Sequence, residues 1–228
     1  MVRRKLRSFG GAEFNPTPYQ RRISPEKFFN MQFYRFGWYG YFYRTAALTE
    51  TFQPLTLLAK KISEIGTVPR GHLPFLLVNR SIPVIEQAHE FIGLRYRVRF
   101  DLESSLLRYL YATEVFSSWY LLIDVEVGKE TNGMRPGEAT EQLLRNGRLP
   151  LDLYEGIALV VAMPEEIIDR TVNLPGCIYR TDDIPYLSLR KDRVLDATTL
   201  KISWSRPRVR YSSWGVASCR ERVSLPET

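Results

Sequence analysis

The sequence predicts an α+β fold: a single domain with a mixed, mostly antiparallel sheet flanked by helices, preceded by an extended basic N-terminal arm. The 228 residues, 44% of them hydrophobic, suffice for one core that closes without metal or disulfide support. Helical and strand-like segments follow one another in mixed order, without the regular alternation of a doubly wound sheet. The two cysteines, Cys177 and Cys219, are too few for a disulfide framework.

Residues 1–22 are the predicted arm, and residues 23–228 are the predicted domain. The arm holds four basic residues near its start: Arg3, Arg4, Lys5 and Arg7. Glycine, asparagine and proline follow instead of an apolar stretch, which favours an extended arm over a secretory signal; an organelle transit peptide is the alternative. No apolar run approaches the roughly 18 residues of a membrane span, so we expect a soluble, cytoplasmic protein.

The first helix is predicted to begin at Ser24 and Pro25, because serine caps free amides and proline fits the first helical position. Residues 28–43 include ten aromatic side chains. With Arg35 and Arg44 they fit either a stacking platform for single-stranded nucleic acid or a helix packed onto the core. A second helix is predicted from Thr49 to the glycine at position 66.

Strands are expected at residues 73–78 and 94–100, because the first is a short apolar run and the second alternates strictly. The alternation places Arg95, Arg97 and Arg99 on one face, where they fit either a phosphate-binding ladder or a solvated face paired with carboxylates.

Five further elements follow in the sequence. The expected strands are residues 119–127, ended by the glycine at 128, and residues 184–189 and 200–204; a helix is expected at 136–145. Asp152 and Glu155 form a capping-box pattern that predicts a helix stopped by Pro164.

Several segments, taken in order, resemble an uncharacterised bacterial family known only as a domain of unknown function. These segments are residues 71–78, 120–126, 128, 130–131, 155–159 and 214–219. The resemblance covers about residues 33–222 and implies one ordered domain, but no reaction, cofactor or site residue. The sequence departs from the family at residues 203–207 and 211–213, where the family has a loop containing Trp and His.

Four residues are weak catalytic candidates: His72, Asp124, Glu126 and Cys219. Cys219 and His72 could pair as nucleophile and base, although an unpaired cysteine is typical of a buried core. Asp124 and Glu126 project from one face of their strand, and a turn at residue 128 would bring Glu130 back toward them, which fits a Mg²⁺ or Ca²⁺ site or acid–base chemistry. The alternative is that these acids pair with Arg95, Arg97 and Arg99 across the sheet, and it is our preferred interpretation because neighbouring strands favour opposite charges.

The basic charge is concentrated at the two ends of the sequence. Residues 1–22 and residues 201–222 each hold six basic residues and one acidic residue. In the second segment Arg206, Arg208 and Arg210 alternate beside Trp204, Tyr211 and Trp214. If extended, the arginines form one charged edge, as in a groove for nucleic acid or acidic peptide, but the pattern also describes an ordinary strand and loop.

The sequence has no phosphate-binding loop, nucleophile elbow or zinc-binding pattern, so we expect no cofactor and no metal. We therefore interpret the protein as a non-catalytic binding or accessory module. It would engage an acidic protein or nucleic acid through its basic N- and C-terminal segments. The alternative is a small-molecule enzyme with a site near His72, Asp124, Glu126 and Cys219. The sequence predicts no oligomeric state.

Overall fold

The computed structural model describes residues 24–41, 68–110, 118–192 and 197–224. Its α-helices are α1 (Pro25–Trp38), α4 (Val84–Glu86), α5 (Pro136–Arg145), α6 (Leu153–Ala162) and α7 (Pro164–Ile167). Its shorter helical turns are the π-helix η1 (Gln87–Phe91) and the 3₁₀ helices η2 (Ile92–Leu94) and η3 (Ser104–Leu106).

Most of the strands form one large sheet. Its strands are β1 (Leu73–Asn79), β2 (Arg97–Phe100), β4 (Trp119–Val127), β5 (Leu149–Pro150), β6 (Arg170–Asn173), β8 (Ile184–Asp192), β9 (Ala197–Ser205), β10 (Trp214–Cys219) and β11 (Glu221–Ser224). The strand order is β1-β4-β10-β6-β8-β9-β2, while β11 pairs with β4 and β5 pairs with β10. Two short strands, β3 (Leu107–Tyr109) and β7 (Cys177–Tyr179), form a separate pair.

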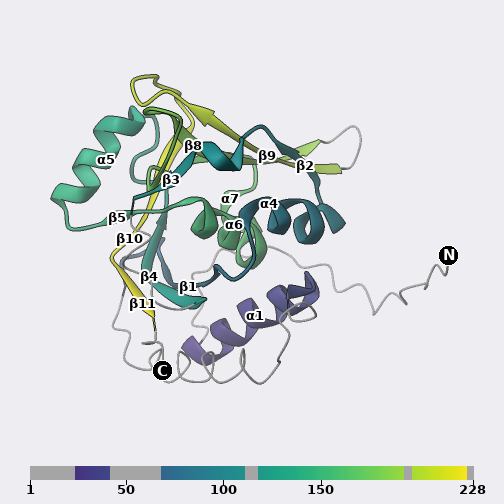
Figure 1. Cartoon of the computed structure of the whole chain (residues 1–228). Coiled ribbons are helices and arrows are strands. Elements are labelled where there is room, and N and C mark those ends of the chain that lie inside the picture. Colours follow the sequence, from purple (N-terminus) through teal and green to yellow (C-terminus); the bar gives the residue numbers. More distant parts are fainter. Residues whose placement is uncertain (1–23, 42–67, 111–117, 193–196, 225–228) are drawn as a thin grey trace.

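Most neighbouring strands of the large sheet are antiparallel, and the β10–β6 and β2–β9 pairs are parallel. Strand β4 lies between β1 on one side and β10 with β11 on the other, whereas β2 lies at the far end of the strand order. Figure 1 shows this separation, with β1 and β4 near α1 and with β9 and β2 beyond α6. The predicted α+β class with a mixed, mostly antiparallel sheet is confirmed.

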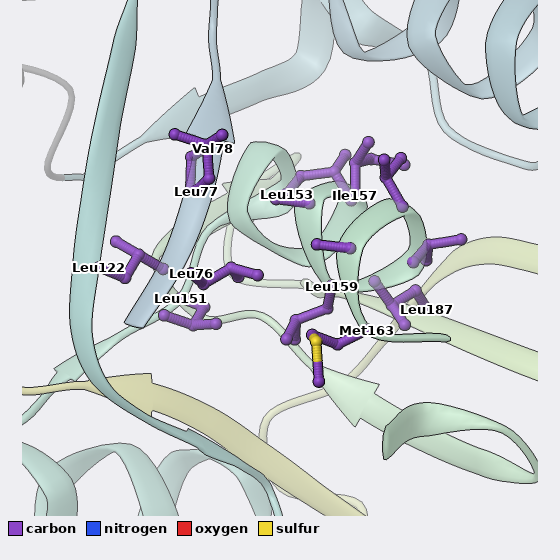
Figure 2. Close-up of a cluster of buried hydrophobic side chains, with 14 of the residues drawn as sticks. Leu76, Leu77, Val78, Leu122, Leu151, Leu153, Ile157, Leu159, Met163 and Leu187 are labelled. Atoms are coloured by element: carbon purple, nitrogen blue, oxygen red, sulfur yellow. The ribbon is translucent and has the colours of Figure 1, made fainter. Parts of the chain in front are cut away.

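Helix α6 forms the centre of the core. All its residues from Glu155 to Ala162 are buried, as expected for a helix that is apolar on every side. The helix contacts both β1 and β8, so the sheet curves around it. Figure 2 shows side chains of β1, β4 and α6 meeting in this core, with Leu187 of β8 on the opposite side of the helix. Gly156 permits the close approach, since a Cβ there would lie 2.5 Å from a methyl group of Leu174.

Helix α1 closes the core on the β1 side. Its Phe28 and Phe36 are fully buried, and their rings contact Phe75 of β1 and Trp119 of β4. Gln32 is also buried, where its side chain bonds the carbonyl of Phe75 and the N–H of Leu77. Packing onto the core is therefore supported for the buried aromatic residues of this segment, whereas Tyr34 and Trp38 are each 74% exposed.

The local signals at helix starts are confirmed. Ser24 caps α1 by accepting a hydrogen bond from the N–H of Lys27. Asp152 and Glu155 form both hydrogen bonds of the predicted capping box, and α6 ends before Pro164. The expected strands at 73–78, 119–127, 184–189 and 200–204 and the helix at 136–145 are present, some of them longer than predicted.

The prediction of a strand from residue 94 is wrong at its start. The 3₁₀ helix η2 occupies Ile92–Leu94, and β2 begins only at Arg97. Arg95 therefore does not belong to an arginine ladder, and its guanidinium lies over the ring of Trp38 at 3.9 Å from the centroid. Alternation alone does not show where a turn ends and pairing begins, because pairing depends on the distant strand β9.

The predicted arm at residues 1–22 and the predicted second helix at residues 49–66 lie outside the described residues. Among the helices that the structure describes, none has the length and apolar character needed to cross a membrane.

Candidate functional site

Asp124 interrupts the pairing of strand β4 with its neighbours. Its backbone adopts the left-handed conformation, with a φ of 56°, which is uncommon for a residue other than glycine and is best tolerated by Asp and Asn. The neighbouring Ile123 pairs with Phe75 of β1 and with Glu221 of β11, but Asp124 has no assigned partner on either strand. Its carbonyl and carboxylate are therefore available to side chains.

Three side chains surround Asp124. The Nδ1 of His72 lies 2.5 Å from one carboxylate oxygen, and Nη1 of Arg148 lies 3.1 Å from the other. Arg148 also donates to the Asp124 carbonyl at 2.6 Å and to Ser218 Oγ at 2.9 Å. Arg220 adds a longer contact of 3.9 Å from its more exposed side chain. Contacts with two arginines and an imidazole therefore offset the cost of burying this carboxylate.

His72 lies between two carboxylates. Its Nδ1 faces Asp124, and its Nε2 lies 2.9 Å from Glu130, whose side chain is 56% exposed. Both ring nitrogens are thus in contact with acids and not with a thiol. Cys219 is fully buried, and burial, followed by the Glu155 carboxylate, raises the pKa of its thiol. These contacts do not support the predicted pairing of Cys219 with His72.

Glu126 points into the loop that follows β4. Its carboxylate accepts hydrogen bonds from the backbone N–H groups of Gly128, Lys129 and Glu130. Burial raises the pKa of Glu126, although these three N–H groups oppose the shift. Its hydrogen-bond partners are therefore backbone groups of its own loop. Glu126 and Asp124 do not share these partners and do not form one binding site.

The predicted pairing of Asp124 and Glu126 with Arg95, Arg97 and Arg99 is wrong. The strand that carries Arg97 and Arg99 lies at the other end of the sheet, so it cannot face β4. Asp124 does pair with arginine, but with Arg148 and Arg220, which come from the segment after α5 and from the junction of β10 with β11. Among the described residues, no group of three or more His, Cys, Asp or Glu side chains is arranged to hold a metal ion.

The loop after β4 is fixed against β10. The hydroxyl of Thr131 donates to the carbonyl of Val216 and accepts from its N–H, at 3.2 and 2.7 Å. Gly128, which ends β4 with a φ of 84°, lies against the backbone of Gly215. Side chains of any size would hold these two backbones apart.

The predicted charged edge formed by Arg206, Arg208 and Arg210 is not extended. The chain turns after β9, where the N–H of Val209 bonds the carbonyl of Arg206. Arg210 is directed to the carbonyl of Gly133, while Arg206 and Arg208 are exposed and make no ion pair with any described residue. Pro207 accounts for the difference, because it cannot donate to a strand ladder and favours a turn.

Trp204 and Trp214 do not form one site. Trp204 stacks loosely on Tyr179, with ring centroids 6.4 Å apart, and Arg180 lies over both rings. Trp214 instead contacts Tyr186 and Tyr211. The predicted binding residues Arg3, Arg4, Lys5 and Arg7 lie outside the described residues.

The sheet itself presents a basic surface whose residues are far apart in the sequence. Arg97 and Arg190 both pair with Thr199 of β9, and Arg99 pairs with Lys201. Residues paired directly across strands project from the same face of a sheet. We call this surface the basic face; its cations are Arg97 and Arg99 of β2, Arg190 of β8 and Lys201 of β9.

The basic face is only partly neutralised. Asp101 lies 2.9 Å from Arg99 and 3.9 Å from Lys201, while Arg97 makes no ion pair with any described residue. Arg190 is directed mainly to backbone and hydroxyl oxygens, including the carbonyl of Asp169 at 2.6 Å. Asp192 of β8 lies on the same face, because it pairs with Ala197 of β9 two residues from Thr199. Four cations therefore face two acids, Asp101 and Asp192, and a surplus of positive charge remains.

A family profile described as "Family of unknown function (DUF5701)" matches residues 110–225, which is just over half of the chain. The chain belongs to DUF5701. The searches of curated proteins and of solved structures gave no match. The predicted resemblance to a domain of unknown function is confirmed, although the match is shorter than residues 33–222 and leaves out residues 71–78.

The DUF5701 match contains both partners of three contacts made by β4 and the loop after it. Gly128 with Gly215, Thr131 with Val216, and Asp124 with Arg148 all lie within it. The family region thus includes β4, β10 and the loop held between them, whereas His72 lies outside the matched residues.

Proposed function

We propose that this member of DUF5701 is a non-catalytic binding module that engages an acidic partner through the basic face and the adjoining loop between β9 and β10. The observation that carries the proposal is the gathering of four cations from three neighbouring strands on one face, against two acids, Asp101 and Asp192. Exposed cations concentrated on one surface attract polyanions and speed their association.

The adjoining loop supports the same proposal. Arg206 and Arg208 are exposed and make no ion pair with a described residue, so their charges are available to a partner. The net charge of the whole protein, +7, has the sign that such a partner requires. The two cysteines of the chain are buried and unpaired, which fits our proposal that the protein acts in the reducing cytoplasm.

The experiment compares binding of a fluorescent single-stranded oligonucleotide and a polyglutamate peptide over a salt series. The test variant carries Arg97→Gln, Arg99→Gln and Lys201→Gln. The control variant carries Lys27→Gln, Arg70→Gln and Arg145→Gln, which remove the same charge from exposed positions elsewhere. We expect the test variant to lower the salt slope of oligonucleotide binding by about two, since each phosphate contact contributes about 0.7 for single strands. Absence of binding at low salt, or equal weakening by both variants, contradicts the proposal.

One observation favours a second candidate function, a small-molecule enzyme with its site at His72 and Asp124. A strained backbone conformation at a buried acid is the kind of feature that clusters at active sites. The other two residues of that hypothesis add no support, because Glu126 is bonded to its own loop and Cys219 is buried in the core. The stability of an Asp124 variant, described in the Discussion, separates a structural from a functional role.

A further inference from the structure

Three aromatic rings lie in contact beside the basic face. Tyr186 of β8 and Trp214 of β10 have ring centroids 4.6 Å apart, and Trp214 stacks on Tyr211 at 3.9 Å with an interplanar angle of 23°. We call Tyr186, Trp214 and Tyr211 the aromatic row. The Nζ of Lys201 lies 5.7 Å from the Tyr186 centroid, so the row begins at the basic face.

Exposure increases along the aromatic row. Tyr186 is buried, Trp214 is half-buried, and Tyr211 is 39% exposed. Because Trp214 covers one face of the Tyr211 ring, the exposed area of Tyr211 lies on the opposite face and the edges. The two inner rings support this outer ring, which leaves one flat aromatic surface available for stacking.

Cations lie at both ends of the aromatic row. Lys201 and Arg99 lie on the same face of the sheet as Tyr186, and Arg208 and Arg210 precede Tyr211 in the loop after β9. A strand of linked phosphates that runs along the row would meet positive charge before and after the exposed ring. Single-stranded nucleic-acid sites combine cations for the backbone with aromatic rings for the bases in this way.

We propose that the acidic partner is a single-stranded nucleic acid and that one of its bases stacks on the exposed face of Tyr211. This inference rests on the proposed function and adds the class of ligand. An acidic peptide would use the cations but has no planar base for Tyr211. A duplex keeps its bases stacked on one another, so a ring on the protein surface has no free base face to cover.

The test compares two ligands and three forms of the full-length protein. The ligands are a fluorescent deoxythymidine oligonucleotide and an abasic strand of the same length, which carries the same phosphates without bases; an oligouridine strand distinguishes RNA from DNA. The proteins are the wild type, Tyr211→Leu and Tyr211→Phe. Leucine still covers Trp214 but removes the aromatic surface, whereas phenylalanine retains it.

We expect the wild type to bind the thymidine strand about tenfold or more tightly than the abasic strand, with little change in salt slope, since stacking adds to affinity without releasing counterions. Tyr211→Leu should remove this preference, and Tyr211→Phe should keep it. Binding of polyglutamate should be the same in all three proteins. Circular dichroism checks that each variant is folded.

The outcomes separate this inference from the proposed function. If the wild type binds the abasic strand as tightly as the thymidine strand, or if Tyr211→Leu keeps the full preference, stacking on Tyr211 is wrong while polyanion binding stands. Tighter binding of polyglutamate than of either strand identifies an acidic protein as the partner and also overturns the inference. If no ligand binds at low salt, both proposals fail.

Discussion

The backbones of Gly128 and Gly215 approach so closely that a Cβ atom on Gly215 would lie 1.8 Å from the carbonyl oxygen of Gly128. Gly215→Ala must therefore separate the loop after β4 from β10, and we expect it to lower the free energy of unfolding by about 3 kcal/mol or more. Gly93→Ala is the control, because its nearest neighbour would be 3.7 Å away. Urea denaturation of both variants checks this, and equal stability would show that the two backbones separate at little cost.

Replacing Asp124 tests whether the cluster around it is structural. In Asp124→Asn the half-buried Arg148 and the buried His72 lose their charged partner, so we expect a loss of about 3 kcal/mol of stability. Glu130→Gln removes a carboxylate from the exposed side of His72 and should cost less than about 1 kcal/mol. An Asp124→Asn variant as stable as the wild type would instead favour the enzymatic candidate, since functional residues are often retained at a cost in stability.

The buried pair of Glu155 and Arg222 should behave non-additively. Arg222 donates to both carboxylate oxygens of Glu155, at 2.6 and 3.0 Å, and neither side chain is appreciably exposed. Arg222→Met leaves the buried carboxylate without this cation and should cost about 3 to 5 kcal/mol. The double variant with Glu155→Gln should lose about 2 kcal/mol less than the sum of the single variants. Additive losses in the chemical denaturation cycle would show that the two groups do not interact.

Asp152 gives a prediction about pH. Burial, followed by the Glu155 carboxylate, raises its pKa from 3.8 to about 7 in the folded protein. Between these values the folded protein holds a proton that the unfolded chain has released, so the contribution of Asp152 to stability falls as the pH rises from about 4 to about 7. Above that window the contribution is constant.

Asp152→Asn cannot titrate and keeps a side-chain oxygen for capping α6. The stability difference, wild type minus variant, should therefore decrease between pH 4 and pH 7 in urea denaturation experiments. A difference that is constant or increases over this range contradicts the assigned direction of the pKa shift.

The predicted arm can be tested by deleting residues 1–22. We expect the melting temperature to change by no more than about 2 °C, because the arm has no apolar periodicity that would place it in the core. The deletion should also reduce the salt slope of oligonucleotide binding, since it removes Arg3, Arg4, Lys5 and Arg7. A large drop in melting temperature would show that these residues belong to the fold.

Features determined by neighbouring residues were predictable from the sequence. Ser24 and the Asp152–Glu155 box mark helix starts because their hydrogen bonds are made within one turn. Strand β4 was predictable because nine consecutive residues suit a strand buried on both faces.

Features that depend on strand order were not predictable. Nothing local to Asp124 indicates that Arg148 and Arg220 will be its partners, because β10 and α5 reach β4 only after the sheet has assembled. The basic face required the registers of β2 and β8 on β9, and its Arg190 had no signal beyond being a charged residue near a strand end.

The position of β4 in the sheet has a consequence for folding during translation. Both neighbours on one of its edges, β10 and β11, are synthesised long after β4 itself. Until they emerge from the ribosome, a strand with seven apolar residues out of nine has unpaired amides along that edge, and such edges recruit other strands. Nascent or prematurely terminated chains should therefore be the aggregation-prone form of this protein, and the abundance of functional protein in a cell should depend on chaperones that cover β4 until translation is complete.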